Sequence, residues 1–583
     1  MPFDGIPQTP IAPLDQNGVY KEGFGELTGK AASDVKDMIF SSLRNKGLLV
    51  RINKYTHRYP VCWRCSTELV FRLVDEWFIS MDGLRDKIAE IARRVNWIPE
   101  FGLQRELDWL RNMDDWMISK KRFWGLALPI YKCDCGYVDV IGSETELEAR
   151  AVEGWKNFQG KSPHRPWIDD VKIECVECSS MVSRIKDVGN VWLDAGIVPY
   201  STIGYRNNRE FWNEWFPADW ISESFPGQFR GWFYSLLVMS TVLEETEPFR
   251  NLYSYATMRD EKGDEMHKSK GNAIWFEEGA EKMGVDSMRW LYARQNPASN
   301  LSFGFGTADD VRRQFIIPLW NVYSFFVTYA NIDGYDSSAA APAAKDRPEL
   351  DRWILSELHS LTKLMTEKLD RYEPEPAAIG MEAFVEDLSN WYVRRSRRRF
   401  WKSETDADKI AAYSTLYECL LTVTKLLAPF VPFITESIYR NLVGPENRSG
   451  DSVHLESFPK VPARWQNEKL FQKWDKLKIV RNVANAAIEV KRSSKEIGSS
   501  LEADIKVYLG EEYLQHSKDV NLPEYTITSK AEAKPMINDD KLFKLDSVDN
   551  VKVLVKKAKG EKCSRCWKIL ESPCERKNCG LKN

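Results

Sequence analysis

Residues 265–272 read EMHKSKGN and follow the turn 260–264, DEKGD. Lys268 and Lys270 flank a serine, and the next residue, a glycine, lets the backbone approach an anion closely. An amphipathic segment, residues 274–283, comes after it. The pattern favours a loop that handles phosphate. A basic surface turn after a hairpin is the competing interpretation of so short a run.

The segments before this loop predict the fold around it. Residues 187–196, DVGNVWLDAG, predict a strand and a turn, and residues 227–234, GQFRGWFY, open a helix that continues to Val242. The stretch from Tyr253 then leads into the lysine loop. This alternation is typical of a parallel α/β sheet, whose ligand lies at the carboxyl ends of the strands. Aromatic residues at such turns usually belong to the core, but here several converge with an acid and a phosphate loop.

Composition limits the class of protein. A chain of 583 residues is too long for one core, so we expect several domains. With 43% hydrophobic and 29% charged residues it is typical of a soluble globular protein. A net charge of -3 means that any nucleic-acid surface is a local patch. We expect no membrane-spanning run and no signal peptide, and therefore a cytoplasmic protein.

Ten of the eleven cysteines lie in close pairs, and Cys419 stands alone in an apolar helical segment. In a long chain without a signal peptide, close pairs favour zinc over disulfides. Two pairs that bracket a helical insertion make a complete set of ligands. They are Cys133, Cys135, Cys175 and Cys178. A closed shell of four thiolates predicts a structural zinc site, because it leaves no open position for catalysis.

The remaining cysteines form two further motifs. Cys62 and Cys65 make a knuckle in residues 59–65, YPVCWRC, but lack a second pair. They either share a zinc site with sequence outside this chain or hold no metal. The tail carries four cysteines in a basic context, which predict a second structural zinc that presents basic residues to RNA or serves stability alone. These four are Cys563, Cys566, Cys574 and Cys579.

A second region is helical. Residues 337–344 are small and non-periodic, which predicts a linker, and residues 351–442 follow a 3.6-residue period, which predicts a helical bundle. Within it, residues 391–401 read WYVRRSRRRFW. Such a run is either a solvated face or a surface for RNA phosphates and bases. The candidates are Trp391, Arg394, Arg395, Arg397, Arg398 and Arg399. Residues 463–495 predict a long helix and residues 501–509 a strand.

These motifs together resemble the C-terminal part of the isoleucyl-tRNA synthetases, which are class I aminoacyl-tRNA synthetases. EMHKS (265–269) stands where that family has Lys-Met-Ser-Lys-Ser. Four further motifs in the same order are similar to family motifs. They are residues 59–65, residues 118–125 (ISKKRFWG), residues 192–196 (WLDAG) and residues 227–233 (GQFRGWF).

The resemblance implies an α/β fold: the C-terminal half of a Rossmann-like class I catalytic domain, a helical anticodon-binding bundle and a small α+β tail with a zinc knuckle. The resemblance implies five segments, beginning at the N-terminus. Residues 1–115 are the remainder of the connective and editing insertion, and 116–310 the catalytic half with a zinc module at about 130–185. Residues 311–460 are the anticodon-binding domain, 461–560 a C-terminal α/β junction and 561–583 the zinc knuckle.

The resemblance also implies the chemistry. ATP, with Mg²⁺, and isoleucine form isoleucyl-adenylate and pyrophosphate, and the aminoacyl group then passes to tRNA(Ile). Positioning and charge stabilisation supply the rate. The bundle is expected to grip the anticodon stem. Lys268 is expected to stabilise the departing pyrophosphate. The remaining implied residues are Met266 and Ser269 for ATP, Glu223 and Gln228 for the adenylate, and Trp192 and Trp232 as walls of the isoleucine pocket.

The sequence departs from the family pattern in several places. Glu265 and His267 replace a lysine and a serine of the loop, and Gly227 replaces an aspartate. The family's His-x-Gly-His signature is absent, since no two of the six histidines stand three residues apart. We therefore expect the N-terminal half to be encoded separately or lost, and this chain alone to be inactive. The alternatives are a non-catalytic tRNA-binding paralogue or a ligase of the related valine and leucine group.

Overall fold

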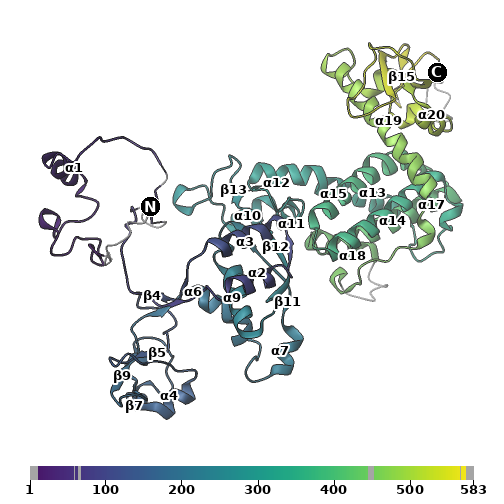
Figure 1. Ribbon diagram of the computed structural model, residues 1–583. Coiled ribbons are helices and arrows are strands. Elements are labelled where there is room, and N and C mark those ends of the chain that lie inside the picture. The colour runs from purple at the N-terminus through teal and green to yellow at the C-terminus, as the bar shows by residue number, and fades with distance from the viewer. Residues whose placement is uncertain (1–10, 58, 63–66, 444–451, 565, 573–583) are drawn as a thin grey trace. The chain divides into compact units, whose positions relative to one another are not determined.

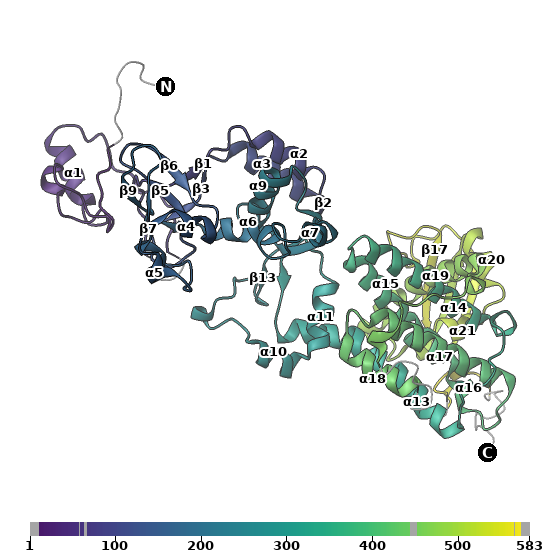
Figure 2. The same ribbon diagram turned by 90° about the horizontal axis from the view of Figure 1, so that it is seen from below.

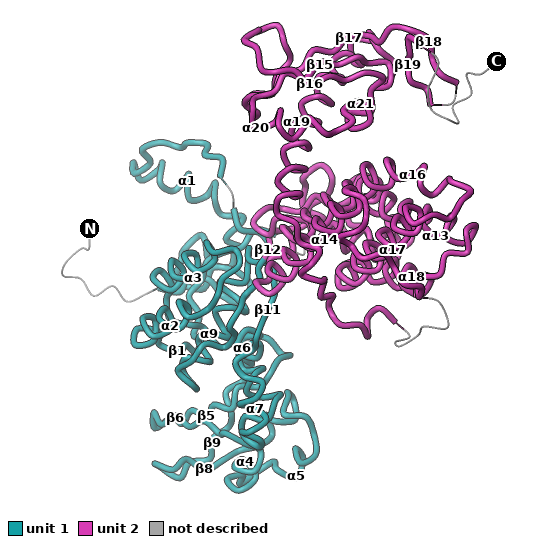
Figure 3. Tube along the Cα trace, turned by 90° about the vertical axis from the view of Figure 1, so that its right-hand side faces the viewer, with its two compact units in different colours: residues 1–254 teal, residues 255–583 magenta. Residues whose placement is uncertain are grey.

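The computed structural model describes residues 11–57, 59–62, 67–443, 452–564 and 566–572. Contacts within it divide the chain into two compact units, residues 1–254 and residues 255–583 (Figure 3). The division falls inside the segment predicted as one catalytic half, residues 116–310. The predicted domain boundaries stay predictions.

A three-stranded sheet lies at the centre of the first unit, in the order β11 (Ala218–Ser224), β12 (Phe249–Tyr255), β2 (Asn96–Ile98). β12 and β2 are parallel, with Asn251 opposite Asn96. The helices near it are α2 (Arg85–Ala92), α3 (Phe101–Asn112), α6 (Val191–Ser201), α7 (Arg209–Trp215), α8 (Phe225–Gln228) and α9 (Trp232–Glu244). Phe233 and Leu237 of α9 are fully buried, as expected for a helix that is apolar on most sides. The predicted parallel α/β arrangement is present in this pair of strands.

Short strand pairs complete this unit. β1 (Phe78–Ile79) pairs with β3 (Trp116–Met117), and β4 (Ser119–Lys120) pairs with β10 (Val188–Gly189). α1 (Lys36–Asn45) lies near the N-terminus.

The prediction of a strand and a turn over residues 187–196 is half wrong. β10 ends at Gly189, and α6 begins at Val191, so the WLDAG motif is helical. Asn190 caps this helix because its side-chain oxygen accepts a hydrogen bond from Trp192 N at 3.2 Å. Gly196 lets α6 pack closely on α9, since a Cβ there would lie 2.7 Å from the carbonyl oxygen of Ser235. The capping asparagine and the close packing explain why a glycine-containing stretch forms a helix.

The cysteine-rich insertion folds around its own small core, which includes Phe158, Val171 and Ile173. Its strands and helices gather in one lobe (Figures 1 and 2). The module holds strands as well as helices between Cys135 and Cys175, where the sequence predicts a helical insertion. Its elements are β5 (Ile130–Lys132), β6 (Val138–Val140), α4 (Glu144–Arg150), β7 (Ala151–Glu153), α5 (Trp155–Phe158), β8 (Lys172–Glu174) and β9 (Met181–Ser183). We call residues 130–183 the cysteine module.

The second unit begins with the lysine loop and continues into the helical bundle. β13 (Met258–Arg259) pairs in parallel with β14 (Leu301–Ser302). Three helices follow the loop: α10 (Phe276–Met283), α11 (Val285–Ala293) and α12 (Phe305–Val311). The bundle consists of α13 (Ile317–Asp333), α14 (Glu349–Asp370), α15 (Pro374–Glu386), a π-helical turn η6 (Asp387–Val393), α16 (Arg394–Trp401), α17 (Ala407–Leu427) and α18 (Pro432–Val443). The predicted bundle is present.

Among the described residues, one helical stretch, Phe305–Asp333, is long and apolar enough to cross a membrane by length and composition. This differs from the expectation that no apolar run has that length. Phe315, Leu319 and Phe326 of this stretch are buried in the hydrophobic core of the helical bundle. A core helix of a globular domain passes the same test of length and composition, because it also has to be apolar.

The tail is an α/β module. The predicted long helix is α19 (Glu468–Ser493), and the predicted strand is β15 (Ala503–Leu509) with alternating burial. The sheet has the order β16 (Lys530–Pro535), β15, β17 (Val551–Lys557), with β16 parallel and β17 antiparallel to β15. The remaining elements are α20 (Glu511–Ser517), α21 (Leu522–Tyr525) and the strand pair β18 (Glu561–Lys562) with β19 (Ile569–Leu570).

Candidate active site, metal centre and nucleic-acid surface

The first unit brings the two predicted pocket tryptophans into neighbouring positions. Trp192 lies in the first turn of α6, and Trp232 begins α9. Between them, a Cβ on Gly231 would lie 2.9 Å from Cζ2 of Trp192, so the indole ring rests against the backbone just before α9. Only glycine fits this contact without displacing the ring. The geometry explains the Arg-Gly-Trp pattern as a packing requirement.

The two predicted adenylate residues flank the same turn. Glu223 lies near the carboxyl end of β11, and Ser254 Oγ donates a hydrogen bond of 2.8 Å to its backbone carbonyl. Gln228 ends α8, and its side-chain oxygen accepts a hydrogen bond of 3.0 Å from Trp232 N. Glu223, Gln228 and both tryptophans are therefore gathered where a strand ends and a helix begins, a usual ligand position in α/β folds.

The lysine loop is a braced turn in the second unit. Asn272 fixes its two ends: its side-chain oxygen accepts from His267 N at 2.9 Å, and its amide nitrogen donates to the Asp260 carboxylate at 2.9 Å. That carboxylate also accepts from Lys262 N and Asp264 N. These hydrogen bonds, the one from Asn272 first, lower the pKa of Asp260. These hydrogen bonds hold the two ends of the loop together.

Lys268 and Lys270 begin and end the 3-10 turn η3 (Lys268–Lys270), with Ser269 between them. Gly271 follows with a φ of +71°, a conformation that favours glycine. Lys268 Nζ lies 4.3 Å from the ring centroid of Trp275, a cation–π contact at an exposed position. The Lys268 ammonium group is therefore close to an aromatic ring and still exposed to solvent.

The two departures in the loop interact with each other. Glu265 lies 3.6 Å from Arg259 and 3.5 Å from His267 Nε2. The Glu265 side chain is 57% exposed, so solvent screens both ion pairs and each contributes little to stability. Met266 is half-buried and packs against the core of the bundle. The loop thus presents Lys268 and Lys270 while the glutamate is engaged with its neighbours.

The four cysteines of the cysteine module converge. Their sulfur atoms all lie within 4.8 Å of one another. Cys133 Sγ is 3.5 Å from Cys178 Sγ, and Cys135 Sγ is 3.7 Å from Cys175 Sγ. A tetrahedral site with Zn–S distances of about 2.3 Å places its sulfurs ~3.8 Å apart. The geometry fits a four-thiolate zinc site, so these residues could hold a zinc ion.

The other predicted metal ligands are only partly described. The Cys62 N–H donates to Thr67 O at 2.8 Å, and Cys65 lies outside the described residues. Cys563 is fully buried and Cys566 partly buried, at the turn between β18 and β19. Cys574 and Cys579 lie outside the described residues. The second predicted zinc site stays a prediction.

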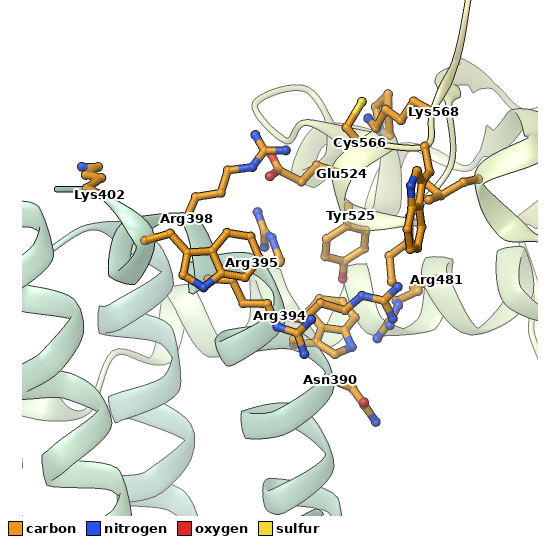
Figure 4. A pocket seen from close by; sticks show the side chains of 17 residues that line it. Asn390, Arg394, Arg395, Arg398, Lys402, Arg481, Glu524, Tyr525, Cys566 and Lys568 are labelled. Atoms are coloured by element: carbon orange, nitrogen blue, oxygen red, sulfur yellow. The ribbon is translucent and has the colours of Figure 1, made fainter. Parts of the chain in front are cut away.

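The arginine-rich helix lines a cavity of about 660 Å³ between the bundle and the tail module (Figure 4). We call it the basic cavity. Arginines from α16 and Arg481 from α19 surround the ring of Tyr525. Its lining residues include Asn390, Trp391, Arg394, Arg395, Arg397, Arg398, Trp401, Lys402, Arg481, Tyr525, Trp567 and Lys568. Cations interleaved with aromatic rings are the combination that binds single-stranded nucleic acid.

Two guanidinium groups of the basic cavity, those of Arg395 and Arg481, are short of hydrogen-bond acceptors. Burial lowers the pKa of Arg395 and of Arg481. Nε and Nη1 of Arg395 and Nε of Arg481 are buried without a hydrogen-bond partner among the described residues. The Arg481 guanidinium lies 4.1 Å from the Trp391 ring centroid. Buried donors of this kind gain most from a ligand that supplies acceptors, such as phosphate or a base edge.

Two of the residues predicted to contact RNA, Arg399 and Trp391, point into the protein and away from solvent. Arg399 makes two hydrogen bonds with the fully buried Asp351, of 2.6 and 2.7 Å, and a further ion pair with Asp408 at 2.9 Å. Trp391 is 4% exposed and packs against Trp474 and Tyr525. Arg394, Arg397 and Arg398 are exposed. The helix therefore has an interior and an exterior arginine face, and Arg399 belongs to the interior one.

Most of the residues that the tail contributes were not singled out from the sequence, but Lys568 is one of the basic residues around the predicted zinc knuckle. Arg481, Tyr525, Trp567 and Lys568 reach the basic cavity from three separate segments of the tail. Arg481 lies on the long helix that sequence periodicity predicted, but nothing in the local pattern separates it from the other basic residues there. Trp567 directly follows Cys566 of the predicted zinc knuckle. That position was the one sequence signal that could have indicated a role for Trp567 in the basic cavity.

Comparison with known proteins defines the class. The sequence model of the family described as tRNA synthetases class I (I, L, M and V) matches residues 2–303, and that of the anticodon-binding domain of tRNA ligase matches residues 351–508. The chain therefore belongs to the class I tRNA synthetases. The expected pairing of a class I catalytic domain with an anticodon-binding domain is confirmed.

Within that class, the similar curated proteins are isoleucine–tRNA ligases. The chain is 37% identical over 520 residues to that of Clostridium tetani, covering 88% of this chain and 49% of the relative. It is 40% identical over 457 residues to that of Thermus thermophilus, covering 77% and 43%. The chain thus spans about half the length of these relatives. Methionyl-tRNA synthetase of Mycobacterium tuberculosis bound by methionyl-adenylate has a similar fold, with a TM-score of 0.50 at 16% identity over 69% of this chain and 71% of that one.

Proposed function

We propose that this chain supplies the C-terminal part of an isoleucine–tRNA ligase. The observation that carries the proposal is the similarity to isoleucine–tRNA ligases over 520 residues, which runs through both the synthetase and the anticodon-binding segments. The sequence holds no His-x-Gly-His motif. In this proposal the complete ligase needs a segment with that motif, within a longer chain or as a separate partner, and acts in the cytoplasm.

Each residue then has a role in the proposed reaction. Lys268 stabilises the charge on the departing pyrophosphate, with Met266 and Ser269 as neighbours in the ATP-binding loop. Glu223 and Gln228 bind the adenylate, and Trp192 and Trp232 wall the side-chain pocket for isoleucine. ATP enters with Mg²⁺, which neutralises phosphate charge. Catalysis rests on positioning and charge stabilisation, so no protein nucleophile is required.

The test is isoleucine-dependent exchange of pyrophosphate into ATP. We expect no exchange from this chain alone. We expect exchange when it is joined to, or mixed with, the His-x-Gly-His segment of a related isoleucine–tRNA ligase. Valine and leucine serve as controls for the amino acid. Exchange by the chain alone would contradict the incomplete-enzyme part of the proposal. Failure of the joined protein, with tRNA binding intact, would favour a non-catalytic tRNA-binding paralogue.

We also propose that Cys133, Cys135, Cys175 and Cys178 hold a structural zinc ion. When bound, zinc closes a tetrahedral shell of thiolates and ties the two halves of the cysteine module together. A further structural zinc at Cys563, Cys566, Cys574 and Cys579 follows from the sequence pattern. Cys62 and Cys65 would complete a site only with ligands from elsewhere.

Replacing Cys175 by serine is expected to remove about one zinc ion per chain and to lower the melting temperature of the cysteine module, because three thiolates leave the shell incomplete. Atomic absorption measures the zinc, and thermal denaturation the stability. Cys419→Ala is the matched control, since Cys419 is buried in α17 far along the chain from the other cysteines. Equal zinc content in Cys175→Ser and the unmodified chain would contradict the site.

The tRNA partner is proposed to be tRNA(Ile), bound through the basic cavity. Replacing both Arg397 and Arg398 by glutamine is expected to weaken tRNA binding and to lower the slope of log K against log salt by about 2, one for each lost phosphate contact. Filter binding at several salt concentrations measures this. Arg371→Gln is the control, because Arg371 is an exposed bundle arginine outside the cavity. An unchanged salt slope in the double variant would exclude these contacts.

A further inference from the structure

A glutamate ahead of the lysine loop occupies a cradle that two glycines leave open. Glu261 belongs to the turn 260–264, and Gly304 and Gly306 lie at the start of α12. A Cβ on Gly304 would overlap Cγ and Cδ of Glu261 and would lie 2.7 Å from its Oε1. A Cβ on Gly306 would lie 2.8 Å from the same oxygen. The Glu261 carboxylate therefore fills space that side chains at 304 and 306 would take.

Thr307 supplies the hydrogen bonds inside this cradle. Its backbone N–H donates to Glu261 Oε1 at 2.8 Å, and its hydroxyl group donates to the same oxygen at 3.4 Å. A hydrogen bond to a carboxylate is stronger than one between two neutral groups. The backbone of Gly304 is extended, with a φ of 176°, a conformation that any residue adopts. Glycine is therefore required at position 304 by the glutamate and not by the backbone.

The turn that carries Glu261 is braced to the lysine loop. Asp260 N donates to Asp264 O at 2.9 Å, which closes the turn. The Asn272 side chain donates to the Asp260 carboxylate at 2.9 Å, which joins the start of the turn to the end of the loop. The turn and the loop therefore form one braced segment. A contact that holds one point of this segment also restricts where Lys268 lies.

Several contacts attach the braced segment to the rest of the second unit. Just before the turn, β13 pairs with β14, and Phe303 N donates to Arg259 O at 2.8 Å. Met266 packs against the core of the bundle. Glu261 attaches the turn itself, and because it is exposed, water can replace Thr307 as its donor at a modest cost in free energy. This contact is therefore reversible, and we call it the Glu261 latch.

We propose that Glu261 is a positioning residue, whose latch on α12 sets the resting position of the lysine loop and so places Lys268 for the phosphates of ATP. The proposal rests on the proposed function, which gives Lys268 its role. Glu261 touches no substrate and acts through the braced segment. A charged group that is held near its working position costs less to bring to the transition state, so the latch favours ATP binding and adenylate formation.

The first test is pyrophosphate exchange by the joined enzyme. Glu261→Ala is expected to raise the KM for ATP about fivefold, the effect of losing one hydrogen bond to a charged group at the surface, and to leave the KM for isoleucine unchanged. Glu261→Gln should keep the KM for ATP, because its amide oxygen accepts the same hydrogen bonds. Gly304→Ala should match Glu261→Ala, since its methyl group displaces the carboxylate. Glu281→Ala, at an exposed glutamate of α10, is the control.

The double variant of Glu261→Ala with Gly304→Ala separates the latch from a general effect on folding. Its KM for ATP should equal that of either single variant, because both substitutions remove the same contact. Additive effects of the two substitutions would overturn the latch. A fall in kcat and in melting temperature without a selective rise in the KM for ATP would also overturn it, since that pattern indicates a loss of folded enzyme.

Digestion of this chain alone by endoproteinase Lys-C tests the latch independently of the proposed function. Cleavage after Lys268 and Lys270 is expected to be about fivefold faster in Gly304→Ala than in the unmodified chain, because the freed loop fits the protease more often while its own sequence is unchanged. Glu261→Gln should be cleaved at the unmodified rate. Equal rates in Gly304→Ala and the unmodified chain would overturn the latch and leave the proposed function standing. Faster cleavage together with an inactive joined enzyme would support the latch and overturn the proposed function.

Discussion

Arg399→Met is expected to lower the free energy of unfolding of the helical bundle by ~3–5 kcal/mol, because it leaves the Asp351 carboxylate buried without its partner. Asp351 is fully buried, and its two oxygens accept both Arg399 hydrogen bonds and one from Tyr392 OH at 2.8 Å. The hydrogen bonds with Asp351 raise the pKa of Arg399 even though burial opposes this. Urea denaturation followed by circular dichroism measures the loss.

Arg397→Met is the matched control, since it changes the same residue type on the same helix at an exposed position. We expect it to change stability by less than about 0.5 kcal/mol. The double variant Asp351→Leu with Arg399→Met should recover much of the lost stability, because replacing a whole buried ion pair with apolar groups is often neutral. Equal stability of Arg399→Met and Arg397→Met would show that the interior face of α16 does not depend on this pair.

Lys268→Ala is expected to slow isoleucyl-adenylate formation by about 10²- to 10³-fold in the joined enzyme, the usual effect of losing one group that stabilises transition-state charge. Lys268 is exposed, and its cation–π contact with Trp275 is worth only ~0.5–1 kcal/mol, so the lysine can leave the ring for a phosphate. Pyrophosphate exchange measures the rate. The Michaelis constant for isoleucine should change little, because the lysine contacts phosphate.

Lys282→Ala is the control for this variant. Lys282 lies on α10, ten residues or more beyond the loop, and pairs with Glu278 at 2.7 Å. Removing it changes the net charge by the same amount without touching the loop, so exchange should stay near that of the unmodified enzyme. If Lys268→Ala also exchanges pyrophosphate at the unmodified rate, the loop's remaining lysines carry the charge and Lys268 loses its assigned role.

Local patterns were enough to predict much of this chain. The 3.6-residue period placed the bundle and α19, since an amphipathic helix must bury its apolar stripe. The alternation of apolar and polar residues placed β15, because successive side chains of a strand point to opposite faces of the sheet. The paired cysteines predicted a four-sulfur cluster, and the structure brings the same four together. The resemblance carried by five short motifs gave the class of protein, which the family comparison confirms.

Local patterns failed where the deciding contact is distant in sequence. Residues 191–196 contain a glycine and were assigned to a turn, but the cap from Asn190 and the packing of Gly196 on α9 make them helical. The partner, Ser235, is far along the chain, so no local window contains it. The same holds for Trp192, whose ring position is set by Gly231.

The arginine run shows the division between sequence and fold most clearly. The sequence by itself determined that 391–401 is a basic, aromatic helix, and that the lysine loop carries Lys268 between atypical neighbours. Only the tertiary structure decided which arginines point into the protein and which point to solvent, because Asp351 on α14 draws Arg399 inward. Arg481 and Tyr525 of the tail complete the basic cavity. A charged side chain on a helix is placed by the partners that the fold brings to it, and those partners lie on other elements.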